Sequence, residues 1–500
     1  MTFHLSRKAI TKMQASLVVV VVIIAVVGGA YAYYSTLTTA PMATTSAMAT
    51  SAMATSANAS LAMGPPIKIA FVPPLTGPAA LTGKQLQDGI MFTYNELKAD
   101  GQIPVKVDGQ YRDIQFIWLD SKSDPATAVA AYNQALVEDG ADIIGWNWHS
   151  SIALAVYTIS TKYDKIDFGD VGETQALSSA RLLDPNASRY YFKCWADPPA
   201  YASVFGPALT SVLQKAGYTP TQKIAALLLE DTDYGRAMGD ALNASLTAQG
   251  WTVKYYDVFS LSPPETDFTP FISKYKDAGV TLVYQVSTGL PSMTAFMKQS
   301  YDANLTAIRA SFGIGWFSTS EWYPALGPAS DYVLSMDSNA ITTPAQMAFA
   351  SKFQAAYGYA PSAVVTGYWG HDLFSMLIEA LNQAGTMNPE TIRTTLLNMD
   401  YHGIFMNVHF TTNEDPPLAY GPMEVIANAT YFHFPLMQWM HGNATAVYPY
   451  TEATGNFVVP PNMQSMGAST GEVTPIFAAI AAVFVVTPVT PGKFSVLTYV

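Results

Sequence analysis

The stretch Ile67–Lys84 (IKIAFVPPLTGPAALTGK) constrains the fold of this chain more than any other. It begins with a buried-strand pattern, which ends at Pro73-Pro74 because proline donates no hydrogen bond to a sheet. A loop of small residues follows, and a helix begins after it. The apolar face of this helix is formed by Leu86, Ile90, Tyr94 and Leu97. In a parallel sheet such a loop lies at the carboxyl end of the first strand, where open α/β folds bind ligands.

The pattern of strand, loop and helix recurs along the chain in two series. The strands predicted for the first series are 114–119, 142–145 and 165–169. After an extended crossing at 189–194, the strands predicted for the second series are 224–229, 252–259, 282–286 and 308–312. Later helical patterns cover 344–357, 368–383 and 389–398, and a strand pattern covers 403–410. Strands alternating with helices predict an α/β fold of two doubly wound parallel-sheet lobes.

Composition limits the classes of partner. The net charge is −12, and charged residues make up 12% of the chain, about half of the ~25% found in ordinary soluble domains. We therefore expect no nucleic-acid partner. The low charge predicts a surface suited to an acidic medium, and a glycosylated surface is the alternative. Cys194 is the only cysteine, so no intrachain disulfide forms, and we expect it to be a small buried apolar residue.

The N-terminal segment 1–34 has the pattern of a membrane anchor. Basic residues precede the uncharged run Leu17–Tyr34, whose 18 residues are just enough to span a bilayer. The basic flank predicts that the N-terminus stays in the cytoplasm and the remainder is exported. A signal peptide cleaved near Ala30-Tyr31-Ala32 is the competing interpretation. The segment also resembles an archaeal prepilin-type signal, which would be cut after Ala9 and would leave the apolar run in place.

Residues 35–66 form a low-complexity stalk that repeats Ala-Met-Ala-Thr-Ser. Such a tract cannot bury enough surface to fold, and we expect it to be exposed and O-glycosylated. Six N-x-[ST] sequons also favour an exported glycoprotein. They begin at Asn58, Asn186, Asn243, Asn304, Asn428 and Asn443. A C-terminal extension, 451–500, contains an apolar stretch at 475–486 that is short for a spanning helix.

Catalytic motifs are not evident, so we expect a protein that is not an enzyme and needs no cofactor. The sequence has no G-x-S-x-G elbow, no Walker A loop and no G-x-G-x-x-G after a strand. The histidines do not show the spacing of a zinc site. Glu230, Asp231 and Asp233 have side chains that a hard cation accepts, but a solvated acidic loop explains them better.

Polar and aromatic side chains gather instead after the predicted parallel strands. The hydroxyl residues are Thr76, Ser150, Ser151, Thr174 and Tyr234. Each taken alone is explained by helix capping, but as a set converging from two lobes they favour binding of a small polar ligand. The aromatic residues are Trp146, Trp148, Trp195, Tyr234 and Trp316. They form either packing between the lobes or an apolar wall for the ligand.

Several of these motifs occur in an order that resembles a known family. They are Ile67–Gly77 with Thr76-Gly77-Pro78, Asp120–Pro125 (DSKSDP), Gly145 followed by Ser150-Ser151, Asp233-Tyr234-Gly235, Asp267-Phe268 and the helix Tyr368–Ala384. Between about Ile67 and Thr412 the chain resembles the type I periplasmic binding proteins of the branched-chain amino-acid and amide uptake family, the leucine-binding-protein-like group. Each motif is loose, but the order and spacing of the set are specific.

The resemblance implies a solute-binding domain, 67–450, whose two lobes are joined by three crossings. The crossings are expected near Lys193–Ala196, Leu334–Asp337 and His402–Ile404. Lobe 1 would then comprise about 67–193 and 337–402, and lobe 2 about 196–334 and 404–450. The solute would bind between the lobes, and a hinge motion would bury it.

The resemblance also implies roles for particular residues. Ser150 or Ser151, with Thr174, would hold a ligand carboxylate, and Tyr234 would contact the ligand from the second lobe. The amino-acid binders carry an acid in the loop that is Gly313–Trp316 here, and this loop has none. Glu173 substitutes for that acid if it points inward, which would favour an amine-bearing ligand. Otherwise an amide, a carboxylate or an aromatic solute fits better.

The function implied is that of a receptor on the cell surface, tethered through its N-terminal helix, that hands a small polar solute to an ABC permease complex. A ligand-binding ectodomain that signals or adheres is the alternative. Only about sixteen residues precede the membrane run, which leaves no room for a cytoplasmic output domain.

Overall fold

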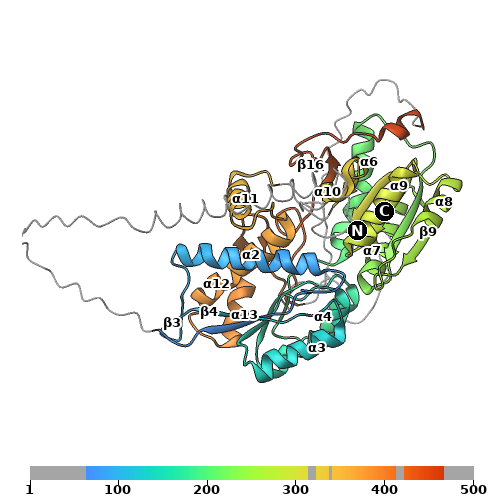
Figure 1. Cartoon of the computed structure of the whole chain (residues 1–500). Helices are drawn as coiled ribbons and strands as arrows, with labels where there is room; N and C mark the ends of the chain where they lie inside the picture. The colour runs from blue at the N-terminus through green and yellow to red at the C-terminus, as the bar shows by residue number, and fades with distance from the viewer. Residues whose placement is uncertain (1–62, 313–321, 337–340, 413–421, 467–500) are drawn as a thin grey trace, which may run out of the picture. The chain divides into compact units, whose positions relative to one another are not determined.

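The computed structural model describes residues 63–312, 322–336, 341–412 and 422–466 (Figure 1). Three predicted features lie outside these ranges: the apolar run 17–34, nearly all of the stalk, and the stretch 475–486. Trp316 also lies outside them. Among the residues described, no helix combines the length and the apolar character needed to cross a membrane.

The first sheet is fully parallel, with strand order β4-β1-β5-β6-β7. Its strands are β1 (Ile67–Phe71), β4 (Ile114–Trp118), β5 (Ile143–Gly145), β6 (Ile166–Asp170) and β7 (Tyr191–Lys193). The helices between them are α2 (Ala80–Ala99), α3 (Pro125–Asn133), α4 (Ser150–Val156) and α5 (Gln175–Leu183), with a short hairpin of β2 (Val105–Val107) and β3 (Gln110–Arg112). The first series of βαβ units is therefore confirmed.

The second sheet has strand order β16-β15-β12-β11-β10-β8-β9. Its parallel strands are β8 (Ile224–Glu230), β9 (Thr252–Phe259), β10 (Leu282–Val286), β11 (Ile308–Phe312) and β12 (Leu334–Ser335). The hairpin of β15 (Leu436–Met440) and β16 (Asn443–Tyr448) adds antiparallel to β12. The accompanying helices are α6 (Pro198–Lys215), α7 (Asp233–Ala248), α8 (Thr269–Asp277), α9 (Leu290–Asp302) and α10 (Trp322–Leu326).

The chain then returns to the first sheet with α11 (Pro344–Tyr357), the π-helical η5 (Ala363–Asp372), α12 (Leu373–Ala384) and α13 (Pro389–Asn398). The helix predicted at 368–383 therefore begins earlier, in π-helical form. The strand predicted at 403–410 is wrong in detail. Asp372 accepts hydrogen bonds from the backbone N–H groups of Ile404, Phe405 and Met406, so the chain turns there. β13 (Tyr401–His402) and β14 (Asn407–Val408) pair as a small hairpin, and Phe410 forms an isolated bridge with Val425.

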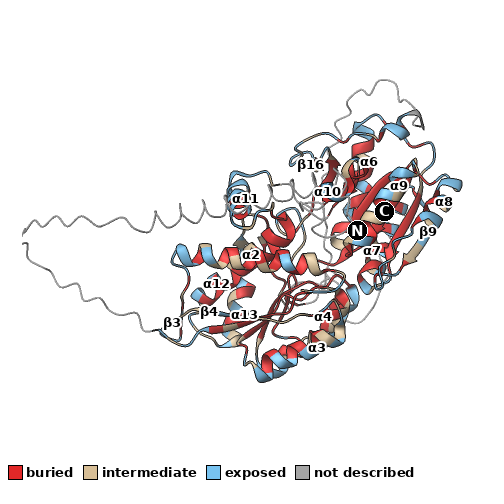
Figure 2. Cartoon of the chain, in the orientation of Figure 1, coloured by how far each residue is buried: buried red, intermediate tan, exposed pale blue. Residues whose placement is uncertain are grey.

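Helices cover both faces of each sheet, as strand alternation requires. In β1, Ile67, Ile69 and Phe71 pack on the cluster that includes α2 and α12, whereas Ala70 packs on that of α3 and α4. In β8, Leu227 packs with α6 and α7, and other residues of the strand pack with α8 and α9. Figure 2 shows the central strands of the sheets buried, the edge strand β9 partly exposed, and the outward helix faces exposed. Asp124 caps α3 as predicted, accepting from the N–H of Thr127 at 2.7 Å.

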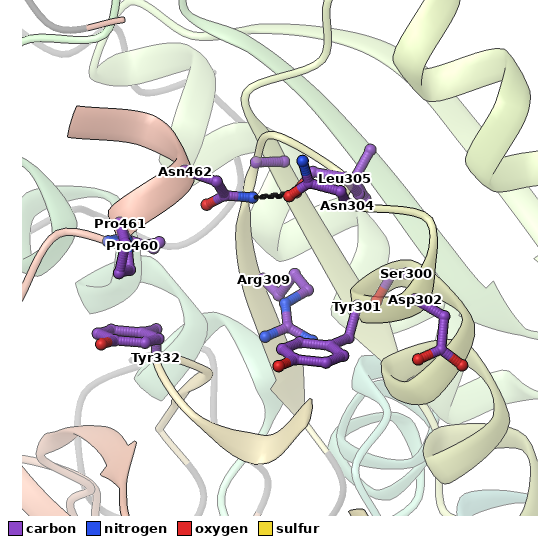
Figure 3. Close-up of a pocket in the computed structure, with 11 residues that line it drawn as sticks. Ser300, Tyr301, Asp302, Asn304, Leu305, Arg309, Tyr332, Pro460, Pro461 and Asn462 are labelled. Carbon is purple, nitrogen blue, oxygen red and sulfur yellow. Dashed lines mark hydrogen bonds between the residues drawn. The ribbon is translucent and has the colours of Figure 1, made fainter. Parts of the chain in front are cut away.

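The first part of the C-terminal extension packs against the second sheet's helices. Asn462 donates from its side-chain amide to Asn304 Oδ1 and to the carbonyl of Leu305, both at 3.1 Å. A pocket of about 540 Å³ opens beside this contact, between Tyr301, Arg309 and Pro460-Pro461 (Figure 3). Arg309 lies near the amino end of β11, so the pocket is at the opposite end of that strand from the loops that carry the predicted site.

Candidate functional site

The loop after β5 owes its shape to a close approach between its Trp146 ring and the backbone of β6. Trp146 and His149 both adopt left-handed backbone conformations, with φ of 55° and 84°. Gly169 in β6 has φ +85°, and a Cβ there would lie 2.6 Å from the Trp146 ring. Glycine is therefore needed at 169 for the ring to lie flat against β6. This packing fixes the direction in which the chain leaves β5 toward Ser150.

Ser150 connects the loops that follow β5 and β6. It is buried at the first turn of α4, and its Oγ accepts a hydrogen bond from the backbone N–H of Glu173 at 2.9 Å. Its neighbour Ser151 is half-buried. The serine hydroxyl thereby holds the start of the Glu173-Thr174 turn at the carboxyl ends of the parallel strands.

Thr174 is the N-cap of α5, and its Oγ1 accepts from the N–H of Ala176 at 3.4 Å. In this structure the Thr174 hydroxyl therefore acts as a helix cap, which was one of the two roles expected from the sequence. Thr174 also lines a groove of about 910 Å³ together with Pro199 and Ser203 of α6 and Asp233 of α7. The residue thus lies between elements of the two sheets.

Glu173 points toward the second sheet's helices. Its side chain is 3% exposed, and its Oε2 accepts a short hydrogen bond from the hydroxyl of Tyr201 on α6. Burial, followed by the nearby charges of Glu173 and Tyr234, raises the pKa of Tyr201 well above its usual range. The tyrosine therefore stays protonated and acts as the donor.

Tyr234 belongs to the same group of side chains. It is buried at the first turn of α7, close enough to Tyr201 to affect its ionisation. The ring of Tyr201 stacks on Phe312 at 5.1 Å and meets Phe434 edge-on at 5.8 Å. Phe312 is the last residue of β11.

Three of the predicted tryptophans, Trp146, Trp148 and Trp195, form the packing behind this group. Trp148 is 2% exposed and lies 4.8 Å from Trp369 and 6.0 Å from Trp195, between ring centroids. Trp195 in turn meets Phe434 at 5.8 Å. Trp146 is fully buried against Phe71 and Phe168. Their large faces therefore support the site through ring packing.

Thr76 lies in a different environment. It is exposed, and its Oγ1 donates to Asp120 Oδ2 at 2.6 Å. Asp120 also accepts from the N–H groups of Leu75 and Thr76, so this pair shapes the loop after β1. The next turn, at Pro78, faces Asp231 and Arg236 across a groove of about 530 Å³.

The acidic side chains Glu230 and Asp231 at the end of β8 form hydrogen bonds and an ion pair with neighbouring side chains of the protein. Glu230 is fully buried and accepts from the N–H and hydroxyl of Thr288 and from the hydroxyl of Thr232. Asp231 pairs with Arg236. Within the described ranges, no three acidic, histidine or cysteine side chains are grouped closely enough to hold a metal ion.

The structure thus brings Ser150, Glu173, Thr174 and Tyr234 into one region, with Trp148 packed behind them, whereas Thr76 lies apart from them beside Asp120. Sequence reasoning missed Tyr201, the donor to Glu173. Its signal was present: Asp197-Pro198-Pro199 is a helix start, which places Tyr201 one turn inside the helix after the chain leaves β7.

A comparison with protein-family models matches residues 66–425 to the periplasmic binding protein family. The chain belongs to the type I periplasmic binding proteins. Among curated relatives of this binding protein is the leucine-, isoleucine-, valine-, threonine- and alanine-binding protein of Pseudomonas aeruginosa, 25% identical over 70% of this chain and 89% of that protein.

Solved structures of other binding proteins share the fold. An R. palustris ABC-transporter solute-binding protein in complex with benzoate has a TM-score of 0.61 at 18% identity, covering 80% of this chain and 99% of that one. The branched-chain amino-acid transporter substrate-binding protein LivJ of Streptococcus pneumoniae, in complex with isoleucine, has a TM-score of 0.61 at 16% identity, covering 76% and 97%. The α/β architecture expected from the sequence is therefore confirmed.

Proposed function

We propose that this binding protein is an extracytoplasmic receptor that delivers a small amine-bearing carboxylate, such as an amino acid, to an ABC importer. The observation that carries the proposal is the contact between Glu173 and Tyr201. It joins the loop after β6 of the first sheet to α6, which packs on the second sheet. Curated relatives with amino-acid-binding names support the solute class.

Glu173 supplies the negative end of the site. Its buried carboxylate accepts from a neutral hydroxyl, and an incoming ammonium group would add an opposite charge, which turns a hydrogen bond with one ionised partner into an ion pair. It thereby fills the role of the acid that Gly313–Trp316 lacks. The ligand carboxylate would be received near Ser150, Ser151 and Thr174, where backbone N–H groups of the α4 and α5 starts gather.

Tyr234 and Trp316 would complete the site from the second lobe. The strand-end turns at Pro78 and Asp231, which face each other across a groove, would form the rim of the site. Thr76 would act by keeping the loop after β1 in place through Asp120. Closure of the two lobes would bring these groups onto the ligand.

The lobes of this proposal are the two sheets with their helices. The first crossing follows Lys193, and the second follows Leu334–Ser335. The third lies after Glu424, because Glu424 still pairs with Lys193 beside the first sheet, whereas Leu436 begins a strand of the second. The proposal therefore has a later third crossing than the 402–404 expected from the sequence.

The solute class has a direct test. Protein purified from its own cells without added ligand is denatured, and the released small molecules are identified by mass spectrometry. We expect an amine-bearing carboxylate in near-stoichiometric amount. A retained carboxylate without an amine, such as benzoate, would contradict the role assigned to Glu173.

The membrane tether is a separate part of the proposal. The basic flank and the 18-residue apolar run Leu17–Tyr34 support a single span with the body outside the cell. Protease added to intact cells should release a soluble fragment that begins within the stalk 35–66. A body that stays protected until the cells are lysed would contradict this topology.

A further inference from the structure

A buried network of charged side chains and one serine lies about one helical turn from the Glu173–Tyr201 contact. It consists of Ser178, Arg181, Lys193, Asp197 and Glu424, all of them buried. Ser178 and Arg181 are on α5, Lys193 ends β7, and Asp197 is the N-cap residue of α6. Two cations and two carboxylates in one buried place need mutual hydrogen bonds to offset the loss of hydration.

Glu424 holds one side of this network. Its Oε1 accepts from Arg181 Nη1 at 2.9 Å, and its Oε2 lies 3.0 Å from Ser178 Oγ. Its backbone forms a bridge with Lys193, whose N–H and carbonyl bond to Met423 and Val425 at 3.0 Å each. The network therefore joins α5 to two chain segments that pass side by side.

Asp197 holds the other side. Its Oδ1 accepts a short hydrogen bond from Lys193 Nζ, and its Oδ2 accepts from Ser178 Oγ at 2.7 Å. Ser178 also accepts from Lys193 Nζ at 3.1 Å, so one hydroxyl touches three charged groups. Burial raises the pKa of Asp197, and the Lys193 ammonium opposes that rise. The Asp197 side chain does not cap its own helix.

The positions of these residues relate the network to the site. Ser178 is four residues after Thr174 on α5, one turn away, and Asp197 is four residues before Tyr201 on α6. The network therefore ties the beginning of the helix that follows Glu173 to the beginning of the helix that carries Tyr201. Neither Ser178 nor Asp197 makes the Glu173–Tyr201 contact itself.

We propose that Ser178 and Asp197 are positioning residues for the solute site. The network sets the separation of α5 and α6, and hence of Glu173 and Tyr201, and it lies where the chain passes between the two sheets. This inference rests on the proposed function in so far as those two residues contact solute. Buried ion pairs can often be replaced by apolar side chains without loss of stability. We therefore assign these charges the role of fixing the relative positions of α5 and α6.

The test uses distance and affinity together. Spin labels are placed at Asn133→Cys on α3 and Asp277→Cys on α8, both exposed positions. Cys194 is fully buried, and burial raises its thiol pKa, so it stays unlabelled. Distance distributions without ligand, and the Kd for leucine by calorimetry, are compared for wild type, Ser178→Ala and Asp197→Asn. Ser292→Ala, a buried serine on α9, is the matched control.

We expect the two network variants to broaden the distance distribution and to weaken leucine binding by about twofold to thirtyfold. The control should resemble wild type in both. If Ser178→Ala and Asp197→Asn match the control while Tyr201→Phe weakens leucine binding, the inference is overturned and the proposed function stands. If wild type itself does not bind leucine, the solute of the proposed function is wrong, and the distance distribution alone decides the inference.

Discussion

The hydroxyl of Tyr201 donates to the carboxylate of Glu173, and the two residues come from elements that pack on different sheets. Both are buried, so the contact removes a carboxylate and a phenol from water together. The pair is the clearest point at which the two halves of the fold meet through polar side chains.

Tyr201→Phe should lower the free energy of unfolding by ~1–3 kcal/mol, because it removes a donor from a buried carboxylate. Tyr218→Phe is the control, since Tyr218 is also largely buried in the protein yet makes no contact with Glu173. Urea denaturation of both variants measures the difference. Equal midpoints would mean that the Tyr201 hydroxyl contributes nothing to the folded state.

Gly169→Ala should destabilise the fold by more than Gly101→Ala. Both glycines have positive φ, +85° and +74°, so both substitutions carry backbone strain of roughly 1–2 kcal/mol. Only at 169 does the new Cβ meet the Trp146 ring at 2.6 Å, whereas nothing lies within 4 Å at 101. Overpacking adds ~1–3 kcal/mol at 169 alone. Similar melting temperatures for the two variants would contradict the packing described for the β5 loop.

A buried pair of carboxyls gives the stability a defined pH dependence. Asp167 and Asp170 contact Tyr132, and Asp170 accepts from the N–H of Asn147. Burial raises the pKa of Asp167 well above its usual range, helped by the Asp170 charge, and burial raises that of Asp170 to about 7. In the unfolded chain both titrate near 4.

The folded state thus holds protons that the unfolded state has lost between about pH 4 and 7, so this pair stabilises the fold at acid pH and loses that contribution as the pH rises. The thermal unfolding midpoint should therefore not fall as the pH is lowered from 7 to 4. Asp167→Asn should flatten this slope. A midpoint that falls sharply between neutral pH and about pH 3 would contradict both this pair and the acid-suited surface expected from the low charge content.

Cys194 should react with thiol reagents only when the protein unfolds. It is fully buried, and burial raises its pKa well above the usual range, so little thiolate is present and none is accessible. Labelling rates measured across a urea series should follow global unfolding. Rapid labelling in native buffer, at a rate independent of urea, would show that the region between β7 and α6 opens locally.

The sequence was most informative where one local pattern decides the structure. Apolar runs followed by proline or small residues marked the parallel strands, and Asp124-Pro125 marked the start of α3. It was least informative where contacts from distant segments decide. The turn at Ile404 depends on Asp372, 32 residues earlier, which no local pattern in 403–410 reveals.

The site shows the same division. Ser150, Glu173, Thr174 and Tyr234 were identified because each follows a predicted parallel strand. Tyr201 was missed because it lies inside a helix. The position after a strand also could not distinguish a hydroxyl that caps a helix, as at Thr174, from one that joins two loops, as at Ser150. Whether these residues bind a solute remains a prediction for experiment.

We propose that Glu173 receives the ammonium group of a solute bound between the two sheets. Calorimetric titration of wild type and Glu173→Gln with leucine tests this role, with benzoate as the amine-free comparison. We expect wild type to bind leucine in preference to benzoate, and Glu173→Gln to weaken leucine binding by roughly tenfold to a hundredfold through the loss of one charge-assisted hydrogen bond. Leucine binding that is unchanged in Glu173→Gln, or wild type that binds benzoate and not leucine, would contradict it.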